Sequence, residues 1–214
     1  MTEPILKKII LALSLMACAI LPAQTTPENT DNQVYVKANA VFLPIGMLNA
    51  AAEFQVSEKT TLQPEIFISP WKSFLGKYAQ MYMLGFDVRH YFSEAFKHFY
   101  VGANVTASRY KMQKYNYWTD APYQYEPDAP IYVTSELYQD GYTFFLGAVA
   151  GYQWQINDKW NIDAFLGGGT AQSFYKGFHK TMGVRYDTDP DREYNRSGEL
   201  VPYRGGLMIS YKIR

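Results

Sequence analysis

The stretch GYTFFLGAVAGYQWQ, residues 141–155, carries an apolar side chain at every second position. These positions are Tyr142, Phe144, Leu146, Ala148, Ala150, Tyr152 and Trp154. Because successive side chains of a β-strand point to opposite faces, all of them share one face. An unbroken apolar face on a long strand is typical of a transmembrane β-barrel, whose outer surface contacts lipid.

Working outward from this stretch, other segments have the same character: they are rich in β-branched and aromatic residues and are bounded by turn residues. The sequence predicts eight strands, at about 34–43, 47–56, 60–69, 80–91, 99–110, 141–155, 160–174 and 202–213. A tilted strand crosses a bilayer in about 9–11 residues, so each segment is long enough. The composition agrees, with 19 Tyr, 13 Phe and 4 Trp beside only 19% charged residues.

The connections between these segments alternate in length. Three short ones, Val56–Lys59, Phe92–Lys97 and Ile156–Lys159, each run from an apolar residue through a polar turn to lysine. The connections between them are expected to be long, at about 70–79, 111–140 and 175–201, and only Pro44-Ile45-Gly46 is short on that side. Outer-membrane barrels have short periplasmic turns and long outside loops. The sequence therefore predicts an all-β protein, an eight-stranded antiparallel up-and-down transmembrane β-barrel.

Alternation also predicts what lies inside the barrel. In the last strand, Tyr203, Leu207 and Ile209 should face outward, and Arg204 and Lys212 should face inward. The charges expected on inward faces are Lys37, Glu53, Glu65, Asp87, Arg89, Asp163, Arg204 and Lys212, four of each sign. Buried charges must be paired, and side chains fill the interior of an eight-stranded barrel. We expect a plugged lumen with a structural charge network; a proton or ion path is the alternative.

The first residues resemble an export signal. Lys7 and Lys8 precede an apolar core at 9–21, and Leu21-Pro22-Ala23 provides a small residue for cleavage. We expect a signal peptide at 1–23, a flexible lead at 24–33 and the barrel domain at 34–214. A transmembrane anchor is the alternative, as is lipidation of Cys18, the only cysteine, although Met16 is atypical for a lipoprotein signal.

Charge and motifs exclude several classes of function. Removal of Lys7, Lys8 and Glu3 would leave 18 basic and 19 acidic residues, which argues against a nucleic-acid partner. The sequence has no Gly-x-Ser-x-Gly, His-Glu-x-x-His or Cys-x-x-Cys motif, and we expect no catalytic residues, no cofactor and no metal. Two weaker readings stay open. His90, Ser93 and Glu94 contain the residue types of a hydrolytic triad, and the carboxylates of 187–191 resemble a calcium loop without its glycine.

The expected fifth connection is the strongest candidate for recognition. Its aromatic residues are interleaved with prolines and are Tyr115, Tyr117, Trp118, Tyr123, Tyr125, Tyr132 and Tyr138. Tyrosine and tryptophan give a large contact area at little cost in conformational entropy. They could form a surface that binds a glycan or a protein, or they could pack together into a cap over the barrel mouth.

Several segments resemble an uncharacterised outer-membrane family that is common in Bacteroidetes, domain-of-unknown-function family 3575. They are Lys37–Ala40, Leu43–Gly46, Ile68–Ser73, Arg89–Phe92, Phe99–Asn104, Leu166–Gly169 and Pro202–Gly206, in order along the chain. The resemblance implies an outer-membrane barrel and no reaction. The last strand is also similar to the signal that barrel-assembly machinery reads, except that the chain ends in Lys212-Ile213-Arg214.

These patterns predict a small barrel in the bacterial outer membrane. Its expected partners are membrane lipids and lipopolysaccharide, the barrel-assembly machinery, and an extracellular glycan or protein. A structural or surface-binding role is the first hypothesis. The alternatives are a lipid A-modifying enzyme, a narrow solute pore and a soluble periplasmic barrel that binds an apolar ligand.

Overall fold

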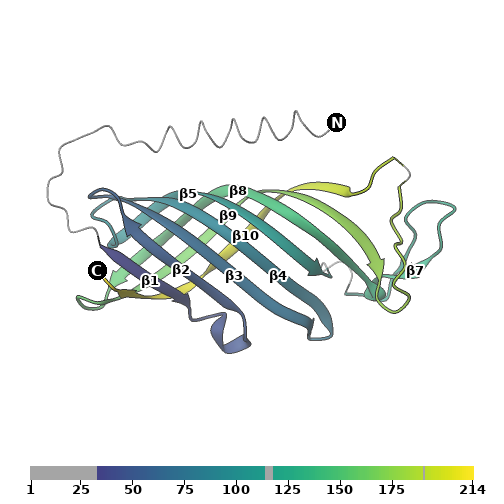
Figure 1. The fold of residues 1–214 in the computed structure, drawn as a ribbon, viewed down its shortest axis with the longest axis horizontal. Helices are drawn as coiled ribbons and strands as arrows, with labels where there is room; N and C mark the ends of the chain where they lie inside the picture. The colour runs from purple at the N-terminus through teal and green to yellow at the C-terminus, as the bar shows by residue number, and fades with distance from the viewer. Residues whose placement is uncertain (1–32, 114–117, 190) are drawn as a thin grey trace. The chain divides into compact units, whose positions relative to one another are not determined.

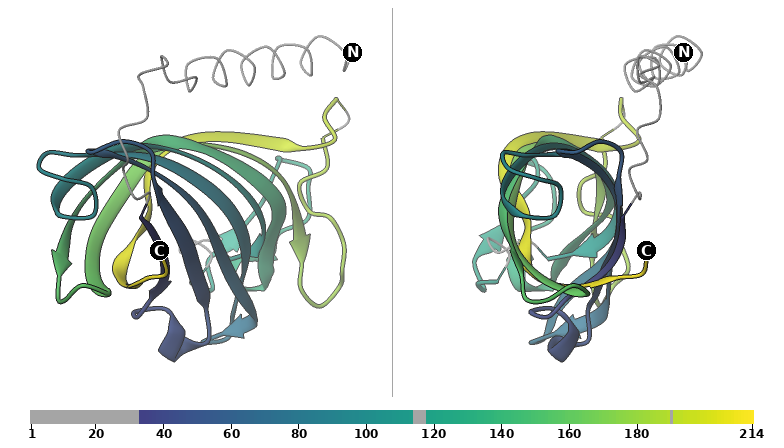
Figure 2. Two further views of the ribbon diagram at one scale, coloured as in Figure 1. Left: turned by 60° about the vertical axis from the view of Figure 1, so that its left-hand side comes forward. Right: turned by 90° about the vertical axis from the view of Figure 1, so that its left-hand side faces the viewer.

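The computed structural model describes residues 33–113, 118–189 and 191–214. The expected signal peptide at 1–23 and nearly all of the lead at 24–33 lie outside these residues. Within them, eight long antiparallel strands form a closed barrel in the order β1-β10-β9-β8-β5-β4-β3-β2. The right-hand view of Figure 2 looks along the barrel axis, so that the strands appear as a ring. None of the helices in the described parts of the chain is long and apolar enough to span a membrane.

The strands follow one another around the ring (Figure 1). The barrel strands are β1 (Val34–Asn39), β2 (Leu48–Gln55), β3 (Thr60–Phe74), β4 (Lys77–Tyr91), β5 (His98–Met112), β8 (Leu137–Gln155), β9 (Trp160–His179) and β10 (Asn195–Lys212). The remaining elements are the 3-10 helices η1 (Leu43–Ile45) and η3 (Thr134–Glu136) and the short strands β6 (Pro122–Tyr123) and β7 (Tyr132–Val133). The prediction of eight antiparallel strands is confirmed.

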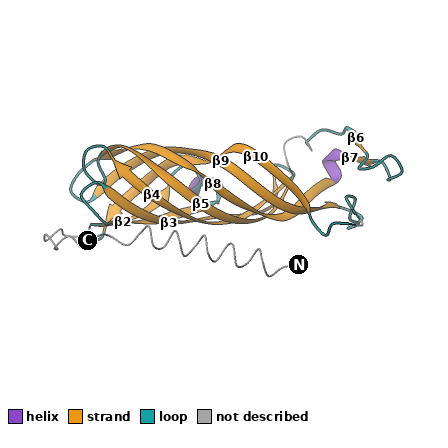
Figure 3. Cartoon of the chain, turned by 90° about the horizontal axis from the view of Figure 1, so that it is seen from above, coloured by secondary structure: helices purple, strands orange, loops and turns teal. Residues whose placement is uncertain are grey.

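One rim of the barrel, here called the turn rim, carries the short turns 56–59, 92–97 and 156–159. The opposite rim, the loop rim, carries the described residues of the two longer connections, 113–136 and 180–194. Figure 3 shows β6 and β7 beyond the end of the barrel on that side. The predicted division into short and long connections is therefore present for these two segments.

The prediction of a long connection at 70–79 is wrong. There β3 and β4 continue to a two-residue turn, Leu75-Gly76, with φ of 50° and 79°. Positive φ at both central residues is the type I′ geometry, whose twist matches that of a hairpin. Pro70 lies within β3, where proline is tolerated because it is on an edge: this end of β3 pairs only with β4 among the described residues.

The alternation of inward and outward side chains follows the prediction along most of the sheet. On β8, Phe144, Leu146 and Trp154 are exposed, whereas Thr143, Val149 and Gln153 are buried. On β4, Tyr82 and Leu84 are exposed, and Asp87 and Arg89 are buried. The outer surface of the barrel is thus apolar and its interior is largely polar.

The predicted outward position of Tyr203 is wrong. The pairing of β10 with β9 shifts by one residue between Pro202 and Arg204, and the Tyr203 hydroxyl donates a hydrogen bond to Asn104 inside the barrel. A β-bulge adds one unpaired residue, which reverses the alternation beyond it. Outward side chains are therefore even-numbered before the bulge, as at Leu200, and odd-numbered after it, as at Leu207.

Candidate functional site

The centre of the barrel holds a cluster of charged side chains, called here the lumen cluster. It consists of Lys37, Glu53, Glu65, Asp87, Arg89, Asp163 and Arg204. They come from β1, β2, β3, β4, β9 and β10 and meet because each occupies an inward position of its strand. With three cations and four carboxylates, the cluster has a formal charge of −1.

Lys37 and Arg89 bridge the carboxylates at its core. Lys37 Nζ lies 2.8 Å from Asp163 Oδ2 and is also paired with Glu53. Arg89 Nη1 lies 2.9 Å from the same Asp163 oxygen, and Arg89 Nη2 lies 3.0 Å from Asp87 Oδ2. All of these side chains are fully buried. Isolated charges here would carry a large desolvation penalty, so the pairing is what allows them to be buried.

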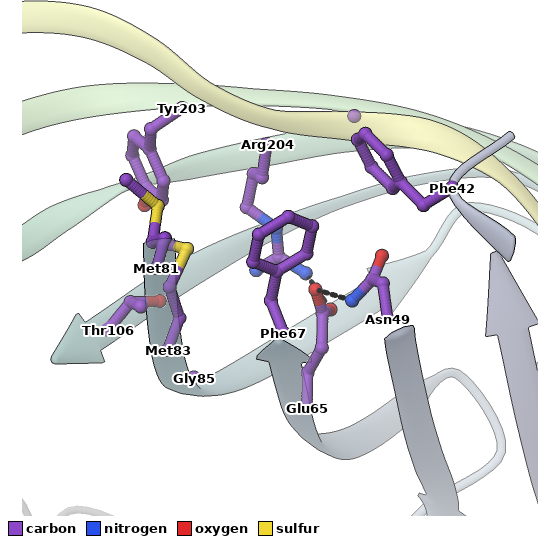
Figure 4. Close-up of a pocket in the computed structure, with 11 residues that line it drawn as sticks. Phe42, Asn49, Glu65, Phe67, Met81, Met83, Gly85, Thr106, Tyr203 and Arg204 are labelled. Atoms are coloured by element: carbon purple, nitrogen blue, oxygen red, sulfur yellow. Dashed lines mark hydrogen bonds and ion pairs between the residues drawn. The ribbon is translucent and has the colours of Figure 1, made fainter. Parts of the chain in front are cut away.

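Arg204 extends the cluster toward the loop rim. Its two terminal nitrogens are paired with Glu65 and Asp87, and Asn49 Nδ2 donates to Glu65 Oε1 at 2.8 Å. Figure 4 shows Arg204 and Asn49 converging on Glu65. Asp87 therefore joins the two arginines, and the network continues through both halves of the barrel.

Two tyrosines complete the network, and neither was predicted from the sequence. The Tyr100 hydroxyl donates to Asp163 Oδ1 at 2.8 Å, and Arg89 lies over the Tyr100 ring, 4.7 Å from its centre. The Tyr91 hydroxyl lies 2.7 Å from Glu53 Oε1 and from Gln153 Oε1. Tyr91 is inward by the same alternation as Arg89, so the pattern of β4 contained the signal.

The structure does not bring Lys212 into the lumen cluster. This residue lies at the end of β10, two positions beyond buried Ser210, and it lines a cavity of about 200 Å³ at the turn rim together with Asp158. It makes no ion pair with any residue in the described part of the chain. Alternation predicted the face of Lys212 correctly. It could not predict the height of this residue along the barrel axis, and at its actual height Lys212 lies outside the layer of paired charges.

The turn between β4 and β5 packs into the barrel at the turn rim. Phe96 is 2% exposed and contacts the Tyr35 ring at 4.5 Å between ring centres, and Ala95 is buried beside them. The Ala95 amide donates to Glu58 of the neighbouring turn at 2.8 Å. Phe96 has a left-handed backbone, with φ of 66°, and the turn bends into the barrel at this residue. An aromatic layer therefore lies between the lumen cluster and the turn rim.

On the loop-rim side of the lumen cluster lies a cavity of about 100 Å³, called here the seam cavity. Figure 4 shows the residues around it, of which Phe42, Phe67, Met81, Met83, Tyr203 and Arg204 carry the larger side chains. Phe42 and Phe67 are in edge-to-face contact at 5.3 Å. Its walls are mostly apolar, with the polar side chains of Asn49 and Thr106 also in the lining, and the Arg204–Glu65 pair forms one end.

The predicted aromatic loop surface is mostly packed against other segments. Tyr123 and Tyr132 contact Tyr186 of segment 180–194, at 5.6 and 6.4 Å between ring centres. The Tyr125 hydroxyl donates to Asn195 at 3.2 Å. Tyr138 lies on β8, not in the loop, and stacks on Phe178 of β9. Trp118 is 57% exposed, and Tyr115 and Tyr117 lie outside the described residues. The described residues of segments 118–136 and 180–194 thus form a packed cap.

Charged groups at the loop rim are engaged with this cap. Lys180 donates its amide to Glu136, and its ammonium lies 5.5 Å from the centre of the Tyr78 ring. Burial lowers the pKa of Lys180, against the opposing effect of the Glu136 carboxylate. Asp187, a residue of the suggested calcium loop, is 2% exposed and accepts bonds from the Gly177 amide and Arg185. The carboxylate oxygens of Asp187 therefore already accept hydrogen bonds from groups of the protein itself.

The residues of the suggested triad do not converge. His90 contacts Phe92, the Ser93 hydroxyl lies 3.3 Å from His98 Nδ1, and Glu94 is paired with Lys97. In the lumen cluster, every carboxylate has a cationic partner. Within residues 33–113, 118–189 and 191–214, no group of His, Cys, Asp or Glu side chains is arranged to hold a metal ion.

The sequence comparisons give a family without a described activity. A family model described as "Protein of unknown function (DUF3575)" matches residues 9–211, which covers almost the whole chain and all of the barrel strands except the last residue of β10. The predicted membership of domain-of-unknown-function family 3575 is thus confirmed. A comparison with curated proteins found no match.

Proposed function

The chain belongs to the DUF3575 family of proteins of unknown function, and from that premise we propose that it is a non-conducting outer-membrane barrel that presents a packed cap outside the cell. In this proposal the barrel spans the outer membrane of a Gram-negative bacterium, of the Bacteroidetes as the sequence resemblance implies. Its role is structural or surface-binding, and it carries no catalytic residues, cofactor or metal.

The observation that carries the proposal is the exposed apolar belt on the outside of the barrel. Leu84, Leu146 and Leu166 on three different strands are 64%, 61% and 67% exposed. Further exposed apolar residues around the ring are Val36, Phe54, Ile66, Val101, Phe144 and Ile209. Water-soluble monomers rarely expose a continuous apolar surface of this kind. In a membrane, lipid acyl chains would cover this apolar surface and keep it away from water.

Aromatic side chains lie near both ends of this belt. Toward the turn rim, Trp160 contacts Tyr211 at 4.8 Å between ring centres, and Trp154 contacts Tyr152 at 4.6 Å. Toward the loop rim, Tyr142 stacks on Phe174 at 5.2 Å. Amphipathic rings favour the interface between hydrocarbon and water, so these pairs support a transmembrane orientation of the barrel.

The interior supports a closed lumen. An ion that crosses the barrel would have to displace the paired charges around Arg89 and pass the buried ring of Phe96. Separating buried ion pairs is costly, which opposes a resting conduction path. The charge network is proposed to be structural, as side chains fill the interior of small barrels.

The proposed partners follow from the outer surfaces. Membrane lipid and lipopolysaccharide would contact the belt, and barrel-assembly machinery would insert the protein. An extracellular glycan or protein would bind the exposed part of the cap, where Trp118, Ile131 and Met182 are 57%, 67% and 55% exposed. Nucleic acid is not proposed, since basic and acidic residues are balanced.

Fractionation and conductance test the proposal together. The protein should be found in the outer-membrane fraction and should be released by detergent but not by high salt. Purified protein in a planar bilayer should give no steady open level. Recovery as a soluble monomer without detergent would contradict the membrane location, and a stable conducting level would contradict the closed lumen.

A further inference from the structure

The barrel wall is much lower at β1 and β2 than elsewhere. These strands have 6 and 8 residues, against 15 to 20 in the other barrel strands. Pairing of β1 with β10 ends at Asn39–Met208, and pairing of β2 with β3 ends at Leu48–Ile68. Beyond these points, β10 pairs only with β9 and β3 only with β4 among the described residues. A gap in the wall, called here the seam, therefore separates the loop-rim ends of β3 and β10.

The segment below the seam is apolar and exposed. It reads Val41-Phe42-Leu43-Pro44-Ile45-Gly46-Met47 and contains η1. Val41, Leu43 and Ile45 are 54%, 48% and 40% exposed. A connection at a water-facing rim is normally polar. This composition fits a segment that contacts hydrocarbon.

The seam begins at the height of the apolar belt. Gly205 of β10 pairs with Leu166, one of the most exposed belt residues, and Leu200 farther along the β10 edge is 82% exposed. Hydrocarbon that covers the belt would therefore also reach the seam. This step depends on the proposed function, because it requires the belt to face lipid.

The seam cavity lies directly behind this opening. Its lining combines the free edge of β10, the last part of β3 that β2 still covers, and the segment between β1 and β2. Tyr203 is on β10, Phe67 is on β3 opposite Asn49 of β2, and Phe42 precedes η1. The inner wall is formed by Met81 and Met83 of β4 (Figure 4). Methionine is flexible and polarizable, so this wall can adapt to an irregular apolar occupant.

We propose that the seam cavity takes up the end of one acyl chain of a membrane lipid, which enters sideways between β3 and β10. The charges favour this occupant. Arg204 at the end of the cavity is already paired with Glu65 and Asp87, and the lumen cluster has one carboxylate more than it has cations. A carboxylate or phosphate would be repelled there, whereas the uncharged end of a chain would not.

The size of the cavity agrees with a chain end. An apolar protein cavity of about 150 Å³ is large enough to bind benzene. The seam cavity is smaller, about 100 Å³, and has no room for a head group or a whole lipid. The remainder of the lipid would lie against Leu200 and Pro202 on the outside of β10, where both residues are exposed.

The test uses the unmodified protein in phosphatidylethanolamine vesicles that contain a phospholipid with a diazirine near the end of one acyl chain. After illumination, peptide mass mapping locates the covalently attached lipid. Met81 and Met83 are compared with Met208, which is an inward methionine with 0% exposure outside the cavity. We expect about tenfold more label at Met81 or Met83 than at Met208, equivalent to about 1.4 kcal/mol of preferential access.

Outward residues distinguish the possible failures. Label at Leu84 and Phe144 without label at Met81, Met83 or Phe67 would overturn the inference and leave the membrane barrel intact. Absence of label at Leu84 and Phe144 as well would overturn the proposed function. Equal label at Met208 and Met83 would mean that lipid enters the lumen generally, which also contradicts a defined cavity.

Filling the cavity provides a second test. The larger side chain of Met83→Trp should occupy the space that the chain end uses. We expect the label at Met81 to fall by about tenfold, which corresponds to a loss of about 1.4 kcal/mol in the free energy of chain uptake. Label at Leu84, the outward neighbour on the same strand, should not change and reports correct insertion. Unchanged label at Met81 in a variant that is correctly inserted would contradict the inference.

Discussion

Arg89 on β4 is bonded to Asp163 on β9, with 2.9 Å between Nη1 and Oδ2, although two strands separate β4 from β9 in the sheet. The contact joins residues 74 positions apart in sequence and crosses the lumen. It is buried on both sides, and Lys37 shares the same carboxylate oxygen. The barrel is therefore held across its interior as well as around its wall.

Removal of the central cation should destabilise the barrel. Arg89→Met leaves Asp87 and Asp163 with less compensation, and breaking a buried pair costs about 3–5 kcal/mol. We expect the free energy of unfolding to fall by a corresponding amount. It is measured by urea titration in detergent micelles, with the folded fraction determined from the electrophoretic mobility of the folded form. Lys111→Met, an exposed change on β5, is the control. Equal stability of the two variants would contradict a structural role for the lumen cluster.

The backbone next to the bulge should require glycine. Gly206 has φ of 147°, and a Cβ atom there would lie 2.3 Å from Asn39 Nδ2. We expect Gly206→Ala to lower stability by about 1–3 kcal/mol, as for other strained backbone positions. Gly198→Ala on the same strand is the matched control, because its nearest neighbour would be 3.5 Å away. Urea unfolding of both variants in micelles measures the difference, and a tolerated Gly206→Ala would show that Asn39 can move away.

The apolar belt allows a test of the membrane environment by substitution. Leu166→Arg places a charge at a residue that is 67% exposed, and a lipid-facing arginine costs about 2–4 kcal/mol near the bilayer midplane. Gln172→Arg, an exposed position nearer the loop rim on the same strand, should cost about 0–1 kcal/mol. Unfolding in lipid vesicles should separate the two. If Leu166→Arg were as stable as the control, the belt would be facing water.

Packing of the cap should depend on Tyr186. This residue is 6% exposed and contacts Tyr123, Tyr132 and Leu137. Tyr186→Ala should remove about 3 kcal/mol of packing, and protease cleavage of segment 180–194 should become roughly a hundredfold faster. Trp118→Ala removes an exposed ring and should leave cleavage unchanged. The protected barrel fragment should be the same in both variants, whereas equal cleavage rates would indicate a cap that is already open.

The sequence by itself determined the strands and most of their faces. Period-two alternation is local, so Phe144 and Val149 could be assigned to opposite sides without any knowledge of their neighbours. The same rule placed Lys37, Arg89 and Asp163 inside. The family was also recognisable from short motifs spread along the whole chain.

Only the tertiary structure decided which inward residues meet and where the wall is interrupted. Contacts such as Arg89–Asp163 depend on the height of each strand along the barrel axis, which follows from the register of all eight pairs and not from any one segment. A one-residue shift reverses the faces of a strand, and the bulge at Tyr203 did this. Pro202 and the glycines at 205 and 206 mark the site as irregular, but they do not say by how many residues the register shifts. The burial of Phe96 and the low wall above β1 are likewise properties of the closed ring.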